Sequence, residues 1–477
     1  MDTNRRDFIK GAATVMAALP TFSVLSQDDP AGVDADPINV AIIGFGCMGE
    51  VLCNAAVKIP GVRVTAVCDI WKLGRDKGRA FLRGMKHNAN VKAYEDYREM
   101  LEKEGKGIDV VIVATPDWMH AEHANACLRA GKHVYCEAPM AHRLEDAKSM
   151  VLAQRETGKV LQVGHHRRSL PRYIHAVDRV IREAGMLGRI HHAYAQRDCF
   201  RASFMTCRER IHIPPETLRQ YGYENMEQFL NWGWFAKHGG GPMLIRGSHQ
   251  VDVFLWALGG IPVSVTAVGG NDYYGREMND AVTAVYEFKA GDGKVCRAQF
   301  QMIPGSYRGG NHEQFMGENG LLTLSARFDA GANVVQRRPD LLTSSLPSKD
   351  EWDAFIQKGL VRPSPRRIPT ALHVASPSLQ CVWVGPTLFC DDEGWVQVEG
   401  GGHDYNFYPL PMTPGEARES GLGSHLGNFF DAVRQNNSGL LTCPAEVAYR
   451  AMVATLAAGE SIAKRQTITF KPEDFRV

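Results

Sequence analysis

Three glycines near the start of the chain have the spacing of a dinucleotide-binding turn. They belong to Gly44-Phe45-Gly46-Cys47-Met48-Gly49, which follows a short apolar run at residues 38–43. Apolar residues at helical spacing come next, so the sequence predicts a strand, a tight turn and a helix. Gly44 permits the turn, Gly46 lets a pyrophosphate approach the backbone, and Gly49 lets the helix pack closely on the strand. All six residues of the turn are predicted to bind the cofactor.

An acidic residue ends the next predicted strand, which covers residues 62–68. Asp69 stands at the distance from the glycines that a ribose-binding acid has. Its carboxylate would bind the ribose hydroxyls of adenosine and repel a 2′-phosphate, which favours NAD as the cofactor. NADP stays open because Lys72 and Arg75 follow closely.

Strands and helices go on alternating through the first third of the chain. Further strands are predicted at 108–114, 132–136 and 160–164, and helices at 120–130 and 144–157. This alternation predicts a doubly wound Rossmann domain at residues 37–168, in which ligands lie at the carboxyl ends of the strands. The further residues expected at the cofactor are Thr115, Pro116, His120, Glu137, Ala138 and Arg167.

The second half of the chain has another pattern. After a helix near 171–183, apolar and polar residues alternate at 189–196, 263–268, 281–288 and 294–302, and helices at 425–434 and 445–463 close the chain. Such alternation is typical of an open, largely antiparallel sheet with one solvated face. Residues 169–477 are therefore predicted to form a substrate-binding α+β domain. Residues 337–411, rich in proline and tryptophan, are expected to be an insertion.

Composition narrows the class of protein. Lys and Arg total 54 and Asp and Glu 53, and this net charge of +1 argues against a nucleic-acid partner. The 11 cysteines include no CxxC pair, so neither a disulfide framework nor a zinc site is indicated. His120 and His123 lack a third ligand nearby, and no metal is expected.

The first thirty residues are typical of an export signal followed by a linker. Arg5 and Arg6 precede an apolar stretch at residues 11–25, which is the arrangement of a twin-arginine signal. Pro20 interrupts the stretch, which is short for a membrane span, so no stable span is expected after removal of the signal. Because this route carries proteins that are already folded, we expect a periplasmic enzyme that holds its cofactor.

Several segments together resemble the Gfo/Idh/MocA oxidoreductase family. They are GFGCMG, CDIWK, VIVATPDWMH, AGKHVYCEAPM, VGHHRRSLPRY, GGGPMLIRGSHQVDV, NFFDAVR and CPAEVAYRAM. The resemblance covers residues 38–475 apart from the insertion. It implies a Rossmann domain with an open-sheet domain, NAD(P), a carbohydrate substrate (a sugar, polyol or related ring) and a homo-oligomer, either a dimer or a tetramer.

Two positions depart from the pattern of that family, in which an E-K-P lysine and a D-x-x-x-H pair carry protons. Ala138 stands at the lysine position and Ile245 at the aspartate position, whereas His249 remains. His249 is the first predicted catalytic residue, because imidazole titrates near neutral pH. Lys237, which precedes the same helix, and His166, which is favoured over its neighbour His165 for contact with substrate, are the others.

Three functions are compatible with this pattern. The one we expect is an NAD(P)-dependent oxidoreductase that transfers hydride from a sugar, polyol or glycoside hydroxyl to a tightly bound cofactor. A second is a lyase or glycosidase that oxidises its substrate only transiently and regenerates the cofactor. A third is a cofactor-binding pseudoenzyme or partner subunit without turnover.

Overall fold

The computed structural model describes residues 37–199, 204–290, 293–304, 311–325, 334–337, 349–363, 387–390, 396–399, 407–410 and 421–477. The expected export signal lies outside these residues, as does most of the expected insertion at 337–411. The described part of the insertion contains α11 (Lys349–Gln357) and the strand pair β14 (Thr387–Cys390) and β15 (Val396–Glu399). Within these ranges, no helix is both long and apolar enough to cross a membrane.

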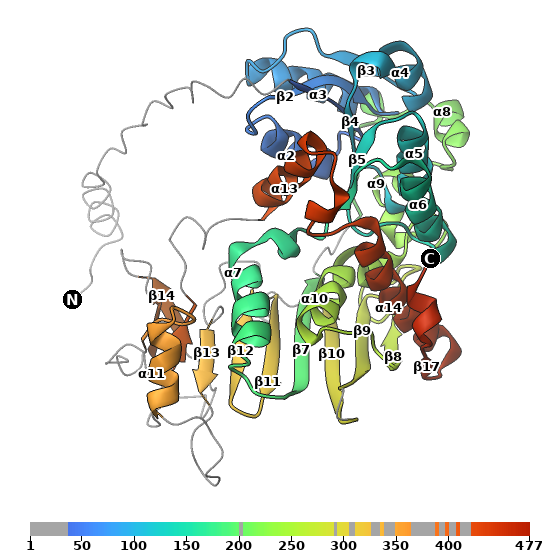
Figure 1. Cartoon of the computed structure of the whole chain (residues 1–477). Helices are drawn as coiled ribbons and strands as arrows, with labels where there is room; N and C mark the ends of the chain where they lie inside the picture. The colour runs from blue at the N-terminus through green and yellow to red at the C-terminus, as the bar shows by residue number, and fades with distance from the viewer. Residues whose placement is uncertain are drawn as a thin grey trace, which may run out of the picture. The chain divides into compact units, whose positions relative to one another are not determined.

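Six parallel strands form the first sheet, in the order β3-β2-β1-β4-β5-β6 (Figure 1). They are β1 (Ile38–Ile43), β2 (Val62–Cys68), β3 (Lys92–Tyr94), β4 (Val110–Val113), β5 (His133–Cys136) and β6 (Leu161–Val163). Every residue of β4 is buried, because helices cover both faces of a doubly wound sheet. The predicted Rossmann sheet is confirmed.

Five helices connect these strands. They are α2 (Cys47–Ala56), α3 (Lys72–Gly84), α4 (Tyr97–Glu104), α5 (Asp117–Arg129) and α6 (Leu144–Thr157). The sequence prediction located α2, α5 and α6 but left out β3, α3 and α4. The buried face of α3 consists of two glycines and Leu82, so few apolar residues mark this helix.

A nine-stranded sheet forms the second half, in the order β16-β13-β12-β11-β7-β10-β9-β8-β17. The strands are β7 (Ile190–Cys199), β8 (Ser264–Gly270), β9 (Ala281–Lys289), β10 (Val295–Pro304), β11 (His312–Gly317), β12 (Gly320–Leu324), β13 (Val334–Arg337), β16 (Phe407–Pro409) and β17 (Ile468–Thr469). Neighbouring strands are antiparallel except β7 and β10. The largely antiparallel sheet is confirmed, and β13 and β16 show that the ends of the insertion extend it.

Helices pack on one face of this nine-stranded sheet. α10 (Ser248–Leu258) packs on β7 and β10, and α14 (Ala445–Lys464) packs on β8. A π-helical turn, Met243–Gly247, leads directly into α10. A 3-10 turn, His166–Ser169, leads from β6 into α7 (Pro171–Ile174) and the π-helical segment His175–Glu183.

The chain returns to the first sheet near its C-terminal end. α13 (Leu422–Arg434) packs against α2, and Figure 1 shows the red helix beside the blue one. Phe429 and Phe430 of α13 share a buried cluster with Val40 and Ile42 of β1. The core of the first sheet therefore includes side chains from the C-terminal part of the chain.

Candidate active site

The glycine turn between β1 and α2 has almost no room for side chains. Gly44 has a φ of +88°, and a Cβ there would lie 2.7 Å from the carbonyl oxygen of Ala114. A Cβ on Gly49 would lie 2.1 Å from the carbonyl oxygen of Gly44. A Cβ on Gly46 would meet no atom within 4 Å, so the turn is closed on one side and open on the other.

The open side of the turn leads to free backbone amides. Gly46 is the N-cap of α2, and among the described residues no side chain caps this helix. Cys47 and Met48 beside it are exposed, whereas Phe45 is buried. Amides without partners at a helix N-terminus bind anions, so the turn fits the pyrophosphate of a dinucleotide.

Asp69 holds the turn in place. Its Oδ2 accepts a hydrogen bond from the amide of Phe45 at 2.7 Å, and its Oδ1 accepts one from the amide of Trp71 at 2.8 Å. A Cβ on Gly74 would lie 2.5 Å from Asp69 Oδ2, so the glycine in α3 makes room for the carboxylate. Burial raises the pKa of Asp69, and the two backbone hydrogen bonds and Arg75 oppose this rise.

Both basic residues that keep NADP open are engaged with acids. Arg75 donates to the carbonyl oxygens of Asp69 and Ile70 and forms an ion pair with Glu95 at 3.0 Å. Lys72 forms an exposed ion pair with Asp76. Neither cation therefore points unpaired toward a 2′-phosphate.

The turn after β4 is tied to the turn after β5. The ring of His120 is buried, and its Nε2 and Nδ1 lie 2.8 Å and 2.9 Å from the carbonyl oxygens of Thr115 and Pro139. Burial lowers the pKa of His120 to about 4, so the ring is neutral. Thr115 Oγ1 contacts His123 Nδ1 at 3.0 Å. These contacts place His120 behind the edge of the sheet as a connector of the two turns, and its contact with the cofactor stays a prediction, as for Thr115 and Pro116.

Glu137 is a buried acid at the carboxyl end of β5. Its Oε2 accepts from the amide of Ala138 at 3.0 Å, and its Oε1 has no partner among the described residues. A Cβ on Gly164 would lie 2.9 Å from Oε2 and 3.1 Å from the hydroxyl of Tyr135, so this glycine leaves space for both groups. Burial raises the pKa of Glu137 to about 7, opposed by the hydrogen bond from Ala138.

Three histidines meet between the two halves of the site. His165 and His166 follow β6, and His249 lies in the first turn of α10. The ring centroid of His249 lies 5.2 Å from that of His166 and 5.4 Å from that of His165. Burial lowers the pKa of His249 well below its ordinary value and the pKa of His166 to about 3, so both rings are neutral.

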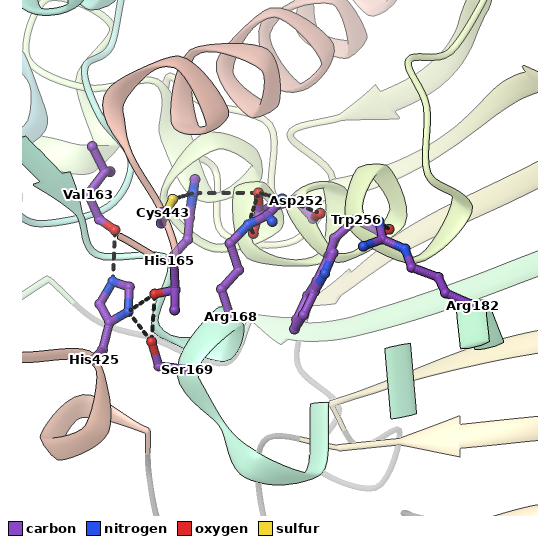
Figure 2. A network of polar contacts seen from close by, with 10 residues as sticks. Val163, His165, Arg168, Ser169, Arg182, Asp252, Trp256, His425 and Cys443 are labelled. Carbon is purple, nitrogen blue, oxygen red and sulfur yellow. Dashed lines mark hydrogen bonds and ion pairs between the residues drawn. The ribbon is translucent and has the colours of Figure 1, made fainter. Parts of the chain in front are cut away.

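The ion pair between Arg168 and Asp252 lies beside His165. Arg168 donates to both carboxylate oxygens of the buried Asp252, at 2.8 Å each. Figure 2 shows His165 between Asp252 and Cys443, with Nδ1 at 3.9 Å from Asp252 Oδ1 and 3.7 Å from Cys443 Sγ. His425 holds the same turn, because its ring nitrogens contact Val163 O at 2.9 Å and Ser169 Oγ at 2.7 Å.

Two further predicted site residues are bound elsewhere. Arg167 is buried and forms an ion pair with Glu313 of β11, which Tyr173 also contacts. This contact fastens the turn after β6 to the second sheet, and a cofactor contact of Arg167 stays a prediction. Lys237 is exposed, and its Nζ donates to the carbonyl oxygen of Gly222 at 3.1 Å. A catalytic role of Lys237 stays a prediction.

One segment of the second half covers the ends of several strands in the first. This bridge segment, residues 204–238, includes α8 (Pro215–Gln220) and α9 (Met226–Leu230). Trp71, after β2, donates from Nε1 to the carbonyl oxygen of Ile211 at 2.6 Å. Trp118, after β4, donates to the hydroxyl of Tyr223 at 3.3 Å and packs on the ring of His238 at 5.1 Å.

A second buried acid lies beside this contact. Asp117 begins α5, is 1 % exposed, and lies near the amides of Trp118 and Gly240. Neither of its oxygens makes a well-directed hydrogen bond within the described residues. Burial raises the pKa of Asp117 to about 8, and the two amides oppose the rise.

Two family models match the chain, one in each half. Residues 38–165 match "Oxidoreductase family, NAD-binding Rossmann fold", and residues 216–323 match "GFO/IDH/MocA C-terminal domain". The chain belongs to the Gfo/Idh/MocA family. The second match decides this, because a Rossmann sheet alone occurs in many families.

Curated relatives of this Gfo/Idh/MocA chain match only part of its length. The 1,5-anhydro-D-fructose reductase of Ensifer adhaerens is 34% identical over 185 residues, which is 39% of this chain and 48% of the relative. The 2,7-anhydro-N-acetylneuraminate hydratase of Escherichia coli (strain K12) is 26% identical over 261 residues, 53% of this chain and 59% of the relative. The chain therefore spans about half the length of these relatives.

A solved structure shows the same fold along almost the whole length. Levoglucosan dehydrogenase, in complex with NADH and levoglucosan, superposes with a TM-score of 0.60 at 18% identity. The match covers 91% of this chain and 100% of that one.

This Gfo/Idh/MocA chain lacks side chains that carry protons at two positions of the family pattern. Ala138 follows Glu137, and Ile245 lies half-buried against Gly233, where a Cβ would approach its Cδ1 to 2.6 Å. Among the described residues, no three His, Cys, Asp or Glu side chains could hold a metal ion. His249 and His166 are then the imidazoles that two separate segments bring together.

The sequence prediction missed Asp252, Arg168 and His425, which hold the histidines. Asp252 gave no signal for this role, because its partners Arg168 and His165 lie more than 80 residues away in the sequence. His425 had none, because its partner Val163 lies 262 residues away in the sequence.

Proposed function

We propose that this chain is an NAD-dependent oxidoreductase that removes hydride from a CH–OH group of a sugar, polyol or glycoside. The observation that carries the proposal is the position of the imidazoles. His249 and His166 gather beside the carboxyl ends of the strands whose glycine turn is open at Gly46. The reductase and dehydrogenase relatives act on compounds of this chemical class.

The residues present fit NAD. Gly46 and the uncapped start of α2 would hold the pyrophosphate, and the partly exposed Asp69 would hold the adenosine ribose. Pairing of Arg75 with Glu95 and of Lys72 with Asp76 favours NAD over NADP. When bound, NAD supplies the hydride acceptor.

His249 is the general base of the proposed reaction. Its ring is neutral near neutral pH, and the residue is half-buried. A neutral imidazole accepts the proton of a hydroxyl as the hydride leaves the carbon. Ala138 and Ile245 cannot share this task, because methyl and butyl groups carry no protons.

The cofactor is retained between turnovers in this proposal. The bridge segment fastens Trp71 and Trp118, which follow β2 and β4 on the two sides of the glycine turn. Release of a dinucleotide would then require these contacts to open. A retained cofactor also agrees with the proposed twin-arginine export of a folded, periplasmic protein, and we propose a homo-oligomer as its state.

A lyase or glycosidase with transient oxidation is the second candidate. Loss of both usual proton carriers favours it, and one relative is a hydratase. Such a reaction needs a base for a C–H proton and an acid for a leaving group, and the two imidazoles provide two proton carriers.

One preparation tests these functions. The purified protein is denatured, its released cofactor is identified, and a second portion is mixed with free sugars, cyclitols and glycosides while absorbance of reduced nicotinamide is followed. The dehydrogenase predicts reduction without cleavage. Cleavage with solvent deuterium entering the ring instead indicates transient oxidation, and bound NAD without any reaction across the panel contradicts both.

A further inference from the structure

The histidine cluster contains one more proton carrier than a single general base requires. His166 and His249 come from segments that are far apart in the sequence, yet their rings are 5.2 Å apart and tilted by 59°. Both are half-buried, whereas His165 is 1% exposed. The first two rings therefore form the part of the cluster that substrate and solvent can reach.

The environment keeps both rings of this pair in the neutral form. His249 is faced by His166, His165, Arg167 and Arg197, and His166 is faced by Arg167, His425 and His165. These groups are cationic or neutral, so a proton taken up by either ring is repelled and moves on easily. Among the described residues, the groups named here for the two rings include no carboxylate that would hold the proton in an ion pair.

His165 has a different place in the cluster. Its Nδ1 faces Cys443 and Asp252, and Asp252 is already engaged with Arg168. The ring packs edge-on against His249 at 76°. His165 therefore supports the ring of His249 from the protein side and does not lead to solvent.

We propose that His166 is a relay residue that takes from His249 the proton of the substrate hydroxyl and delivers it to solvent. The inference rests on the proposed oxidation. In that step the O–H bond breaks and a proton adds to His249, while the C–H bond breaks and its hydride reduces NAD, leaving a carbonyl. The proton then passes from His249 to His166 and to water, which restores both neutral rings. His165 is a positioning residue.

The kinetic test compares His166→Asn with a matched control in a second histidine pair. Asparagine keeps polarity but carries no proton at these pH values. His191 and His192, with ring centroids 5.5 Å apart, lie at the start of β7, so His192→Asn removes one member of a pair outside the site. We expect His166→Asn to lower kcat about 10- to 100-fold with KM changed less than about threefold, and added imidazole to restore part of kcat. His192→Asn should stay within about twofold of the wild type.

The pH profile supplies a readout that a purely structural role would not move. His166 and His165 add to the burial that lowers the pKa of His249, so loss of His166 raises that pKa. The acid limb of the kcat profile should then move to higher pH in His166→Asn. An active variant with unchanged kcat and an unchanged profile overturns the relay.

Nuclear magnetic resonance of the 15N-labelled holoprotein tests the pair without turnover. The imidazole resonances of His166 and His249 should both report the same two titration steps, because the macroscopic pKa values of two coupled groups belong to the pair. Independent titration in the wild type overturns the proposal, even where His166→Asn does not fold. A wild type without hydride transfer on any substrate contradicts the proposed oxidation instead, and the two failures are thereby distinguished.

Discussion

The cofactor edge and the proton-carrying cluster are built in opposite ways. The cofactor edge is formed mainly by backbone atoms. Its glycines let a ligand approach the backbone, the amides at the start of α2 have no capping side chain among the described residues, and Asp69 accepts hydrogen bonds from two amides of the same domain. In the cluster, side chains from the turn after β6, from α10 and from α13 meet, and Ala138 and Ile245 occupy the positions where the family pattern has proton carriers. The difference teaches that cofactor binding and proton transfer are separate properties of this chain, so each can be removed while the other is kept.

The largest effect is expected from Gly49→Ala. Its Cβ would lie 2.1 Å from the carbonyl oxygen of Gly44, so the turn must move and bound NAD should be lost from the purified protein. Overpacking of this kind costs about 1–3 kcal/mol, visible as a lower midpoint of urea unfolding. Gly46→Ala is the matched control, because its Cβ meets no protein atom: it should keep the midpoint and lose NAD affinity. Equal stability losses in both variants would contradict an open cradle at Gly46.

The next largest effect is expected from His249→Asn, which removes proton transfer and leaves the cofactor edge intact. We expect kcat to fall about 10²- to 10⁴-fold, since the general base is removed. The amount of NAD released on denaturation should equal that of the wild type. If this variant lost its cofactor as well, the two regions would not be separable.

A smaller effect is expected where the two regions are tied together. Trp118→Leu removes the hydrogen bond to Tyr223 and the packing on His238, and aromatic pairs contribute about 0.5–1.5 kcal/mol. Release of NAD should become about tenfold faster, measured by trapping free NAD after rapid dilution. Phe475→Leu removes a buried ring at the other end of the chain and should leave the release rate unchanged. Equal rates for Trp118→Leu and the wild type would show that the bridge segment does not retain the cofactor.

The last expected effect is a dependence of stability on pH, which leaves the cofactor and the proton carriers unchanged. The pKa of Asp117 is about 8 in the folded chain, above the ordinary value of 3.8. The folded state then binds more protons than the unfolded state, so this stability is fully present below pH 3.8 and is lost as the pH rises to about 8. The slope is at most about 1.4 kcal/mol per pH unit for one proton. Urea unfolding between pH 5 and pH 8 should show a flatter dependence in Asp117→Asn, with a remainder from Glu137, and an identical slope would exclude Asp117 as its source.

The parts that could be predicted from the sequence depend on neighbours in the chain. The glycine turn, β1 and α6 show their periodicity and turn residues within a few positions, and the structure places these elements where the sequence does. Both sheets were predictable in type for the same reason. α3 was not, because its buried face contains Gly74 and Gly78 where apolar residues would have revealed it.

The candidate site was predictable in part. The sequence singled out His166 after a strand of the first sheet and His249 in a family motif. Their contact joins two segments that no local pattern relates. The bridge segment gave no signal either, since Trp71 and Ile211 are 140 residues apart. Lys237 stays a prediction, because a position before α10 does not fix which way a flexible side chain extends.

The proposed retention of the cofactor by the bridge segment limits how much product each chain can form. If the contacts of Trp71 and Trp118 retain the dinucleotide, as proposed, it does not exchange with NAD in solution. Without a second molecule to take the hydride back, each chain can form one product molecule and then stops. The product formed per chain is therefore measured with and without an added carbonyl acceptor. Without the acceptor, it gives the number of hydrides that the bound cofactor accepts.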